Sequence, residues 1–142
     1  MSRFSEFLIK HWPLFLALFT LIVTLLAVEL RRRLSGLHDL GPLEATRMIN
    51  HQNAVILDIR NDGEYHQGHL HEAVHIPLGD LSRRMTELEK YRERPIITYC
   101  SSGSRSARAA SLLLKQGFTQ VYNLRGGVMA WQSASLPLQK KK

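Results

Sequence analysis

The chain has a single cysteine among its 142 residues and contains no low-complexity tract. One cysteine excludes an intramolecular disulfide, and the lack of a second one excludes a zinc knuckle or a CxxC redox centre. A lone free thiol is typical of a reducing compartment. The length fits one compact domain with an appendage and excludes a two-domain enzyme. A composition that is 44% hydrophobic and 22% charged also excludes a disordered tail.

Acidic residues are few, 12 against 19 lysines and arginines, so the formal net charge is +7. The eight basic residues within 1–33 and 140–142, less Glu6 and Glu29, account for +6 of this charge. This excess beside an apolar segment and at the C-terminus is typical of membrane-flanking segments rather than of a groove for phosphates. We therefore expect no nucleic-acid partner. The last three lysines either contact anionic lipid or form a solvated tail.

Residues 12–28 form a run of 17 residues without a charge. As a helix this run is roughly 25 Å long, which is just enough to span a bilayer. Trp12 lies where an interfacial anchor is expected, and Pro13 falls in the first turn, where a proline is tolerated. The pattern predicts one transmembrane helix, with membrane contact through residues 12–30.

A cleaved signal peptide and a buried core helix are the alternatives to an uncleaved anchor. The apolar region of a signal peptide usually has about 7 to 15 residues and ends in small residues, whereas this run ends in Glu29-Leu30-Arg31-Arg32-Arg33. A core helix normally has a polar face. The three arginines outnumber Arg3 and Lys10 on the other side, so the positive-inside rule predicts that the C-terminal domain faces the cytoplasm.

The composition divides the chain into an N-terminal tail with the anchor, a glycine-containing linker, a compact domain and a basic tail. Their expected bounds are 1–33, 34–42, 43–137 and 138–142. Within the domain, short apolar runs alternate with amphipathic ones. Strands are expected at 54–57, 74–76, 95–99 and 121–124. Helices are expected at 43–50, 62–66, 79–91 and 105–116, with a short last helix around Ala130 and Trp131. This alternation predicts an α/β sandwich around a mostly parallel sheet of four or five strands.

Cys100 directly follows the predicted strand 95–99. In open parallel sheets, reactive groups collect just past the C-terminal ends of the strands. The small residues after the cysteine let successive amide N–H groups point into one loop, where they bind anions. These residues are Ser101, Ser102, Gly103 and Ser104. The next helix begins near Arg105, and both its dipole and the guanidinium favour the thiolate form of Cys100.

A second interpretation of Cys100 is a small hydrophobic core residue, the commoner role of a cysteine after a buried strand. A core thiol has no use for the adjoining Ser-Ser-Gly-Ser segment or for Arg105, so the context favours a chemical role. Arg108 lies on the same helical face and extends the positive field. Asp58 and Arg60, at the end of the first predicted strand, are expected to hydrogen-bond neighbouring loops and hold the shape of the site.

The segment Cys100-Ser-Ser-Gly-Ser-Arg105, between a strand and a helix, resembles the active-site loop of rhodanese-type sulfurtransferases. Other segments are similar to the same family: Leu57-Asp58-Ile59-Arg60, Glu64-Tyr65, Gly68-His69-Leu70, Ala73-Val74-His75-Ile76-Pro77, Gly117-Phe118, Val121-Tyr122-Asn123-Leu124, Gly126-Gly127 and Trp131. The resemblance covers about residues 40–137. With the apolar segment in front, the chain resembles the bacterial membrane-anchored subgroup with one rhodanese module, which implies the bacterial inner membrane as its location.

The resemblance implies a rhodanese-like three-layer sandwich and a persulfide cycle without a separate cofactor. In that cycle the Cys100 thiolate attacks the outer sulfur of a donor such as thiosulfate, and an acceptor such as cyanide or a thiol later removes the sulfur. The loop amides and the Arg105 guanidinium are the candidates for holding the anionic leaving group. Many family members carry arginine directly after the cysteine, whereas Ser101 stands here. A protein persulfide or a low-molecular-weight persulfide is therefore an alternative donor.

Cysteine phosphatases and arsenate reductases of the same fold need arginine at the sixth position after the cysteine. Ser106 occupies that position, so we expect no phosphoryl transfer. The alternative function is a non-catalytic rhodanese-fold module that binds a partner at the membrane, since a fold does not guarantee its chemistry. Four nearby histidines lack a cysteine or a well-spaced carboxylate to complete a shell, so we expect no metal. They are His66, His69, His71 and His75.

Overall fold

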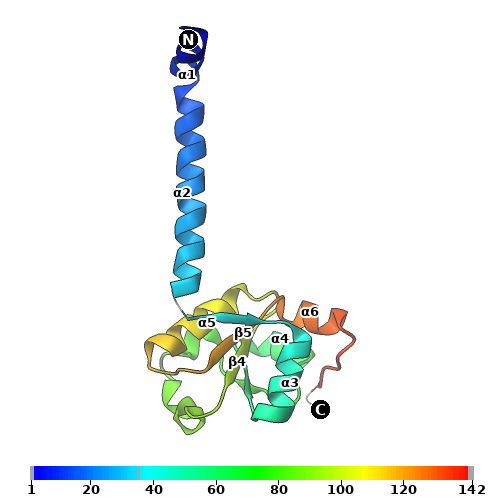
Figure 1. Ribbon diagram of the computed structural model, residues 1–142. Coiled ribbons are helices and arrows are strands. Elements are labelled where there is room, and N and C mark those ends of the chain that lie inside the picture. Colours follow the sequence, from blue (N-terminus) through cyan, green and yellow to red (C-terminus); the bar gives the residue numbers. More distant parts are fainter. Residues whose placement is uncertain (1, 35, 141–142) are drawn as a thin grey trace. The chain divides into compact units, whose positions relative to one another are not determined.

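The computed structural model describes residues 2–34 and 36–140. The chain divides into two units, and the boundary lies between residues 35 and 36. The N-terminal unit consists of the helices α1 (Ser2–Lys10) and α2 (Trp12–Leu34), labelled in Figure 1. The segment Trp12–Arg31 of α2 is long and apolar enough to cross a membrane, with a mean hydropathy of 2.3 and no buried residue.

Two threonine side chains lie within this apolar segment, and the helix itself satisfies both. Thr20 Oγ1 donates to the carbonyls of Leu16 and Ala17, each at 2.9 Å. Thr24 Oγ1 donates to the carbonyls of Thr20 and Leu21, at 2.9 and 2.8 Å. Hydroxyls bonded in this way expose no unsatisfied donor. The segment is therefore compatible with a hydrocarbon environment.

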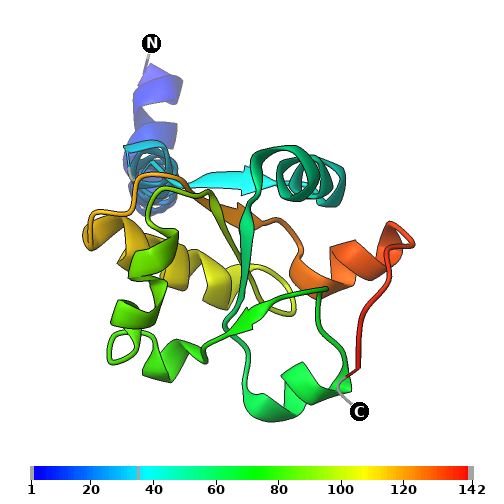
Figure 2. The same ribbon diagram turned by 90° about the horizontal axis from the view of Figure 1, so that it is seen from below.

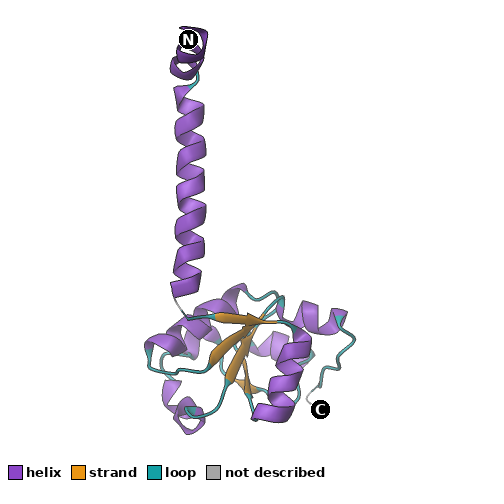
Figure 3. Cartoon of the chain, in the orientation of Figure 1, coloured by secondary structure: helices purple, strands orange, loops and turns teal. Residues whose placement is uncertain are grey.

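The second unit is built on one sheet of five strands (Figures 2 and 3). They are β1 (His38–Leu40), β2 (Val55–Asp58), β3 (Val74–His75), β4 (Ile96–Tyr99) and β5 (Val121–Leu124). Their order is β1-β5-β4-β2-β3, and every pairing is parallel. The prediction of a mostly parallel sheet is confirmed. Since β4 is the middle strand, the residues after it lie at the centre of the C-terminal edge of the sheet.

Helices cover both faces of this sheet. They are α3 (Pro42–Gln52), α4 (Asp62–Gln67), α5 (Ser104–Lys115) and α6 (Gly127–Ser133), with the 3-10 helices η1 (Leu78–Asp80) and η2 (Met85–Tyr91). Val55 and Leu57 join a first hydrophobic cluster with α5, and Ile56 joins a second one with α3 and α6. Successive strand residues point to opposite faces, so the chain forms the three-layer α/β sandwich that the resemblance implies.

Residues 79–91, predicted as one helix with Leu81, Met85 and Leu88 facing the core, do not form one continuous helix. The structure has η1 and η2 there, separated by turns. Salt bridges of this segment join residues three apart, a spacing that places side chains one above the other in a 3-10 helix. They are Asp80–Arg83, Arg84–Glu87 and Glu89–Arg92. Leu81 and Leu88 are fully buried and Met85 packs against the first cluster, so the inward face is confirmed.

The segments predicted as linker and basic tail both contain residues whose backbone pairs with the domain. Residues 38–40, inside the predicted linker, form β1 and pair with β5. Leu138 packs against the second cluster, and Gln139 pairs with His69 through backbone hydrogen bonds of 2.8 and 2.7 Å. Backbone pairing leaves no mark in composition, which is why the sequence assigned these residues to connections. Outside the described residues lie Lys141 and Lys142.

Candidate active site

Cys100 lies at the C-terminal end of β4, where the loop to α5 begins. Its side chain is buried, with 1% of the residue exposed. The loop turns at Gly103, whose φ of 101° falls in the left-handed region that favours glycine. A Cβ at this position would come within 3.3 Å of the Gly126 amide nitrogen. This tight turn places the cysteine beside the first turn of α5, as the sequence predicts.

Two donors contact the sulfur of Cys100. The amide of Gly103 donates to Sγ at 3.0 Å, and the hydroxyl of Ser106 lies 3.4 Å from the same atom. Burial raises the pKa of the thiol, but the Ser106 hydroxyl and three backbone amides lower it, and the net pKa lies below the ordinary value. These amides belong to Ser106, Gly103 and Ser102. The site therefore favours the thiolate more than a free cysteine does.

The hydroxyl of Ser106 lies between this sulfur and the side chain of Asn123. Asn123 Nδ2 donates to Asp39 Oδ1 at 3.1 Å and to the Gly103 carbonyl at 3.2 Å, so its Oδ1 faces Ser106 as an acceptor. A thiol at Cys100 can donate to Ser106 Oγ while Ser106 donates to Asn123. When Cys100 is a thiolate, the Ser106 hydroxyl instead donates a hydrogen bond to its sulfur. The hydroxyl can thus serve both protonation states of the cysteine.

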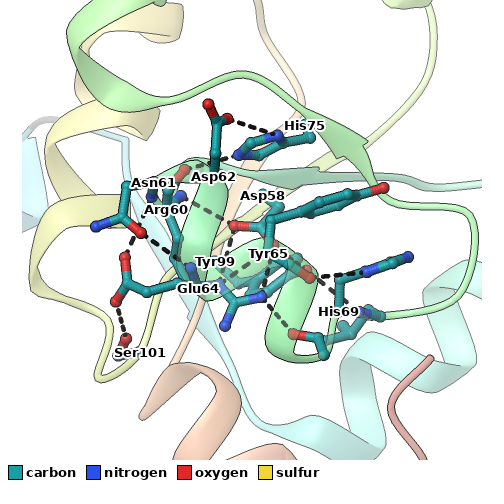
Figure 4. A network of polar contacts seen from close by, with 12 residues as sticks. Asp58, Arg60, Asn61, Asp62, Glu64, Tyr65, His69, His75, Tyr99 and Ser101 are labelled. Carbon is teal, nitrogen blue, oxygen red and sulfur yellow. Dashed lines mark hydrogen bonds and ion pairs between the residues drawn. The ribbon is translucent and has the colours of Figure 1, made fainter. Parts of the chain in front are cut away.

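Arg105 is held by a carboxylate from a different element. Glu64 of α4 accepts from Arg105 Nη1 at 2.9 Å and from Nη2 at 2.8 Å. The same carboxylate accepts from Ser101 Oγ at 3.0 Å, a contact drawn in Figure 4. Its hydrogen bonds with Arg105 are the main reason why the pKa of Glu64 is lowered to about 2. Glu64 is therefore ionised throughout the physiological pH range.

Asp58 and Arg60, at the end of β2, form a buried ion pair, and the Tyr99 hydroxyl is hydrogen-bonded to it (Figure 4). Arg60 Nη2 lies 2.7 Å from Asp58 Oδ2, and the Tyr99 hydroxyl donates to the same oxygen at 2.6 Å. Arg60 also donates to the Gly68 carbonyl at 2.7 Å. Burial raises the pKa of Tyr99, which keeps its hydroxyl protonated. The network joins the end of β2 to the residue before Cys100, an arrangement that suits the predicted shape-holding role.

The predicted loop residues do not all face the sulfur. Ser101 and Arg105 contact Glu64, Gly103 donates to the sulfur, and Arg105 also interacts with Cys100, more weakly than with Glu64. The exposed residues of the loop are Ser102 and Ser104. Arg108 is exposed, and its side chain has no hydrogen bond or ion pair with the described residues of the loop. Ser106, Asn123 and Glu64 also belong to the site, although their sequence context predicts no contact with the cysteine loop for them. Only Ser106 carries a local signal, because it lies in the first turn of the helix that follows the cysteine loop.

The four histidines singled out in the sequence have other partners. His69 and His75 both stack on Tyr65, with ring centroids 4.0 and 4.2 Å apart, and Figure 4 shows the three rings in one layered group. His75 Nε2 also lies 2.8 Å from the Arg60 carbonyl. Within residues 2–34 and 36–140, no group of three or more histidine, cysteine, aspartate or glutamate side chains is placed to hold a metal.

A cavity of about 470 Å³ lies away from the cysteine loop. Its walls include Ile49 of α3, Val55 of β2, Trp131 of α6 and Pro137 in the segment after α6. No residue of the Cys100–Ser106 loop lines it. The Cys100 sulfur and this apolar cavity are therefore separate features of the domain.

Comparison with known proteins relates the second unit to one family. Residues 42–134 match the family described as rhodanese-like domain. The chain is 31% identical to the protein YibN of Escherichia coli K12 over 143 residues, an alignment that covers the whole of both chains. It is 37% identical over 92 residues to a sulfurtransferase of Allochromatium vinosum, covering 65% of this chain and 84% of the relative.

The same domain also occurs within longer proteins. A tRNA uridine(34) hydroxylase of Acinetobacter baumannii is 34% identical over 121 residues, which cover 82% of this chain and 38% of the relative. The crystal structure of a thiosulfate sulfurtransferase from Pseudomonas aeruginosa matches with a TM-score of 0.69 at 27% identity, covering 80% of this chain and 22% of that chain. The fold is thus shared by proteins whose names state different activities.

Proposed function

Because the chain belongs to the rhodanese-like domain family, we propose that it is a sulfurtransferase that carries sulfane sulfur as a persulfide on Cys100. One observation carries this proposal. The buried sulfur of Cys100 lies beside the Gly103 amide and the Ser106 hydroxyl, and its pKa is lowered. A thiolate is the nucleophile that sulfur transfer needs. A relative that is named a sulfurtransferase supports the same activity.

The proposed reaction consists of two displacements at sulfur. In the first, the Cys100 thiolate attacks the outer sulfur of the donor. The sulfur–sulfur bond of the donor breaks, and its electron pair leaves with the remainder, which is sulfite when the donor is thiosulfate. In the second, a thiolate or cyanide attacks the outer sulfur of the Cys100 persulfide and regenerates the thiolate. Each step forms one bond to the transferred sulfur and breaks another, so the cycle needs no external oxidant, reductant or cofactor.

We propose that the loop amides stabilise the negative charge on the thiolate and then on the persulfide. The loop consists of Ser101, Ser102, Gly103, Ser104 and Arg105. Asp58 and Arg60 do not contact the sulfur. They are positioning residues, because their network with Tyr99 holds the backbone that precedes Cys100.

We also propose that α2 anchors the protein in the bacterial inner membrane, with the rhodanese-like domain in the cytoplasm. The apolar segment Trp12–Arg31 supports the anchor. The alignment with YibN includes this segment. The excess of arginines at its C-terminal end supports the orientation. In this arrangement the sulfur donor and the thiol acceptor meet Cys100 on the cytoplasmic side, where thiols are kept reduced.

Intact-mass measurement of the full-length protein in detergent tests the sulfurtransferase proposal. Incubation with thiosulfate or a thiol persulfide is expected to add the mass of one sulfur atom, because the Cys100 thiolate captures the outer sulfur of the donor. Cyanide or a thiol is then expected to remove it. The Cys100→Ser variant, which has no thiol, is expected to keep its mass throughout. If no donor adds sulfur to the wild type, sulfur transfer is excluded, and the non-catalytic binding module becomes the function to test.

The Ser106→Ala variant is expected to need a higher pH for reaction of Cys100. Among the groups that lower the pKa of this thiol, the Ser106 hydroxyl has the largest effect. Its removal therefore raises the pKa of the Cys100 thiol, because the thiolate loses a hydrogen-bond donor. The thiolate then forms only at higher pH. The measurement is the rate of alkylation by iodoacetamide as a function of pH, whose midpoint moves upward.

Ser111→Ala is the matched control for this prediction. The Ser111 hydroxyl lies on the same helix but donates to the Ala107 carbonyl at 3.0 Å. Its removal is expected to leave the alkylation midpoint at the wild-type pH. Equal midpoints for the Ser106→Ala and Ser111→Ala variants would mean that the Ser106 hydroxyl does not stabilise the thiolate.

A further inference from the structure

Arg105 is the first basic residue after Cys100 in the loop, and its guanidinium is already bound by a carboxylate of the protein. Two of its terminal N–H groups bind the two carboxylate oxygens of Glu64, at 2.9 and 2.8 Å, and Nη2 also lies 3.1 Å from Ser101 Oγ. Such bidentate pairing is the geometry that an arginine uses to bind an anionic ligand. Glu64 therefore occupies the position on Arg105 that an anionic sulfur donor would otherwise take.

Glu64 is held firmly in this position by its own helix. It is the third residue of α4, and its amide donates to Asn61 Oδ1 at 2.9 Å. In return, the Asn61 amide donates to Glu64 Oε2 at 3.2 Å, which completes a capping box. These partners hold the Glu64 carboxylate against Arg105 in the folded domain.

The charges around the sulfur sum to a negative value once the thiolate forms. Cys100 and Glu64 each contribute one negative charge, and Arg105 contributes one positive charge. The exposed arginines Arg108 and Arg125 have no side-chain hydrogen bond or ion pair with the loop among the residues that the structure describes. From the side chains that contact the loop, a dianion therefore meets net repulsion, whereas a donor with one negative charge or none at its reacting end meets less.

We propose that Glu64 determines donor specificity by neutralising Arg105, so that the enzyme takes sulfur from thiol persulfides in preference to thiosulfate. This inference rests on the proposed persulfide cycle of Cys100. With a persulfide, the Cys100 thiolate attacks the outer sulfur of R–S–SH, the bond between the two donor sulfurs breaks, and its electron pair leaves as the thiolate R–S⁻. With thiosulfate, the leaving group is the sulfite dianion. The loop thus has to accommodate one departing negative charge rather than two.

Rates of sulfur loading onto Cys100 test the proposal, measured by intact mass on the full-length protein in detergent. The donors are thiosulfate and cysteine persulfide, and the variant is Glu64→Gln, since glutamine keeps the capping box but removes the charge. We expect the wild type to load faster from cysteine persulfide. The variant is expected to load from thiosulfate about tenfold faster than the wild type, because Arg105 becomes available to the dianion. Its rate with cysteine persulfide is expected to rise less, so that the ratio of the thiosulfate rate to the persulfide rate increases.

Ionic strength separates this electrostatic role from a structural one. The gain of the Glu64→Gln variant with thiosulfate is expected to shrink as salt is added, because salt screens the released charge of Arg105. A general loosening of the loop would change loading from both donors, without this salt dependence. Glu87→Gln is the matched control, since it opens a bidentate pair with Arg84, of 2.8 and 3.0 Å, in η2. Its loading rates are expected to equal those of the wild type.

A second variant gives an independent result if Glu64→Gln fails to fold. Ser101→Arg adds a cation directly after the cysteine without removing Glu64 and is expected to speed loading from thiosulfate. The specificity proposal is overturned if the wild type prefers thiosulfate, or if neither variant raises its ratio of thiosulfate to persulfide rates. Failure of the wild type to load from either donor overturns the sulfurtransferase function itself. The two failures are therefore distinguishable.

Discussion

Alanine in place of Gly127 is expected to destabilise the folded domain by about 2–5 kcal/mol, the sum of left-handed backbone strain and overpacking. Gly127 has a φ of 53°, and a Cβ there would overlap the carbonyl oxygen of Cys100 and lie 2.8 Å from that of Ser101. Both neighbours are backbone atoms, so no side-chain rotation relieves the contact. The same carbonyls accept hydrogen bonds from Val128 and Met129. Relief by moving α6 would therefore also release the cysteine loop.

Tryptophan fluorescence during thermal or urea unfolding measures this loss. Trp12 and Trp131 are the two tryptophans of the chain, so a Trp12→Phe background leaves the buried Trp131 as the reporter of the domain. Gly79→Ala is the matched control, because a Cβ at Gly79 would meet nothing within 4 Å. We expect the unfolding midpoint of this control, in temperature or in urea, to lie close to that of the parent protein. Equal stability of the two alanine variants would contradict the predicted overlap at Gly127.

The Asp58→Ala variant is expected to lose about 3–5 kcal/mol of unfolding free energy, because it leaves a buried charge without its partner. Arg60 is 5% exposed and donates to Asp58 through Nε and Nη2, at 3.0 and 2.7 Å. The Tyr99 hydroxyl loses its acceptor at the same time. Water cannot replace these bonds at a site where the carboxylate is fully buried.

Urea unfolding of Asp58→Ala against Asp80→Ala tests this prediction. Asp80 pairs with Arg83 at 2.9 Å on the surface, where both side chains are largely exposed, and such a pair contributes about 1 kcal/mol or less. The double variant Asp58→Ala/Arg60→Met is expected to recover part of the loss, because it removes the unpaired charge as well. A loss no larger for Asp58→Ala than for Asp80→Ala would mean that the buried pair does not hold the fold together.

The strands at the centre of the sheet could be predicted from the sequence, and those at its edges could be predicted only in part. Residues 55–58, 96–99 and 121–124 are short apolar runs bounded by polar residues, because each is covered by helices on both faces. β1 has the sequence His-Asp-Leu and no buried residue. It exists because β5 offers it a row of backbone partners, and pairing of this kind is independent of hydropathy.

The candidate site could be predicted where it depends on neighbours in sequence. The position of Cys100, the turn at Gly103 and the helix that follows belong to one continuous segment, whose order of residue types predicts their geometry. Glu64 reaches Arg105 across 41 positions. The local sequence therefore predicts that this arginine binds an incoming anion, not a carboxylate of the chain itself. No local pattern of charge contains that information.

The position of β1 in the sheet also has a consequence for the order of folding. Among the described residues, β1 pairs with β5 alone, in a register that joins His38 to Tyr122, 84 positions later. Closing a loop of this length precedes any gain from the pairing, which makes such contacts slow to form. During synthesis, the first strand to leave the ribosome must therefore wait for the last. Until residue 124 has emerged, the edge of β1 is unpaired, and a chaperone or a neighbouring nascent chain has its longest opportunity to bind there.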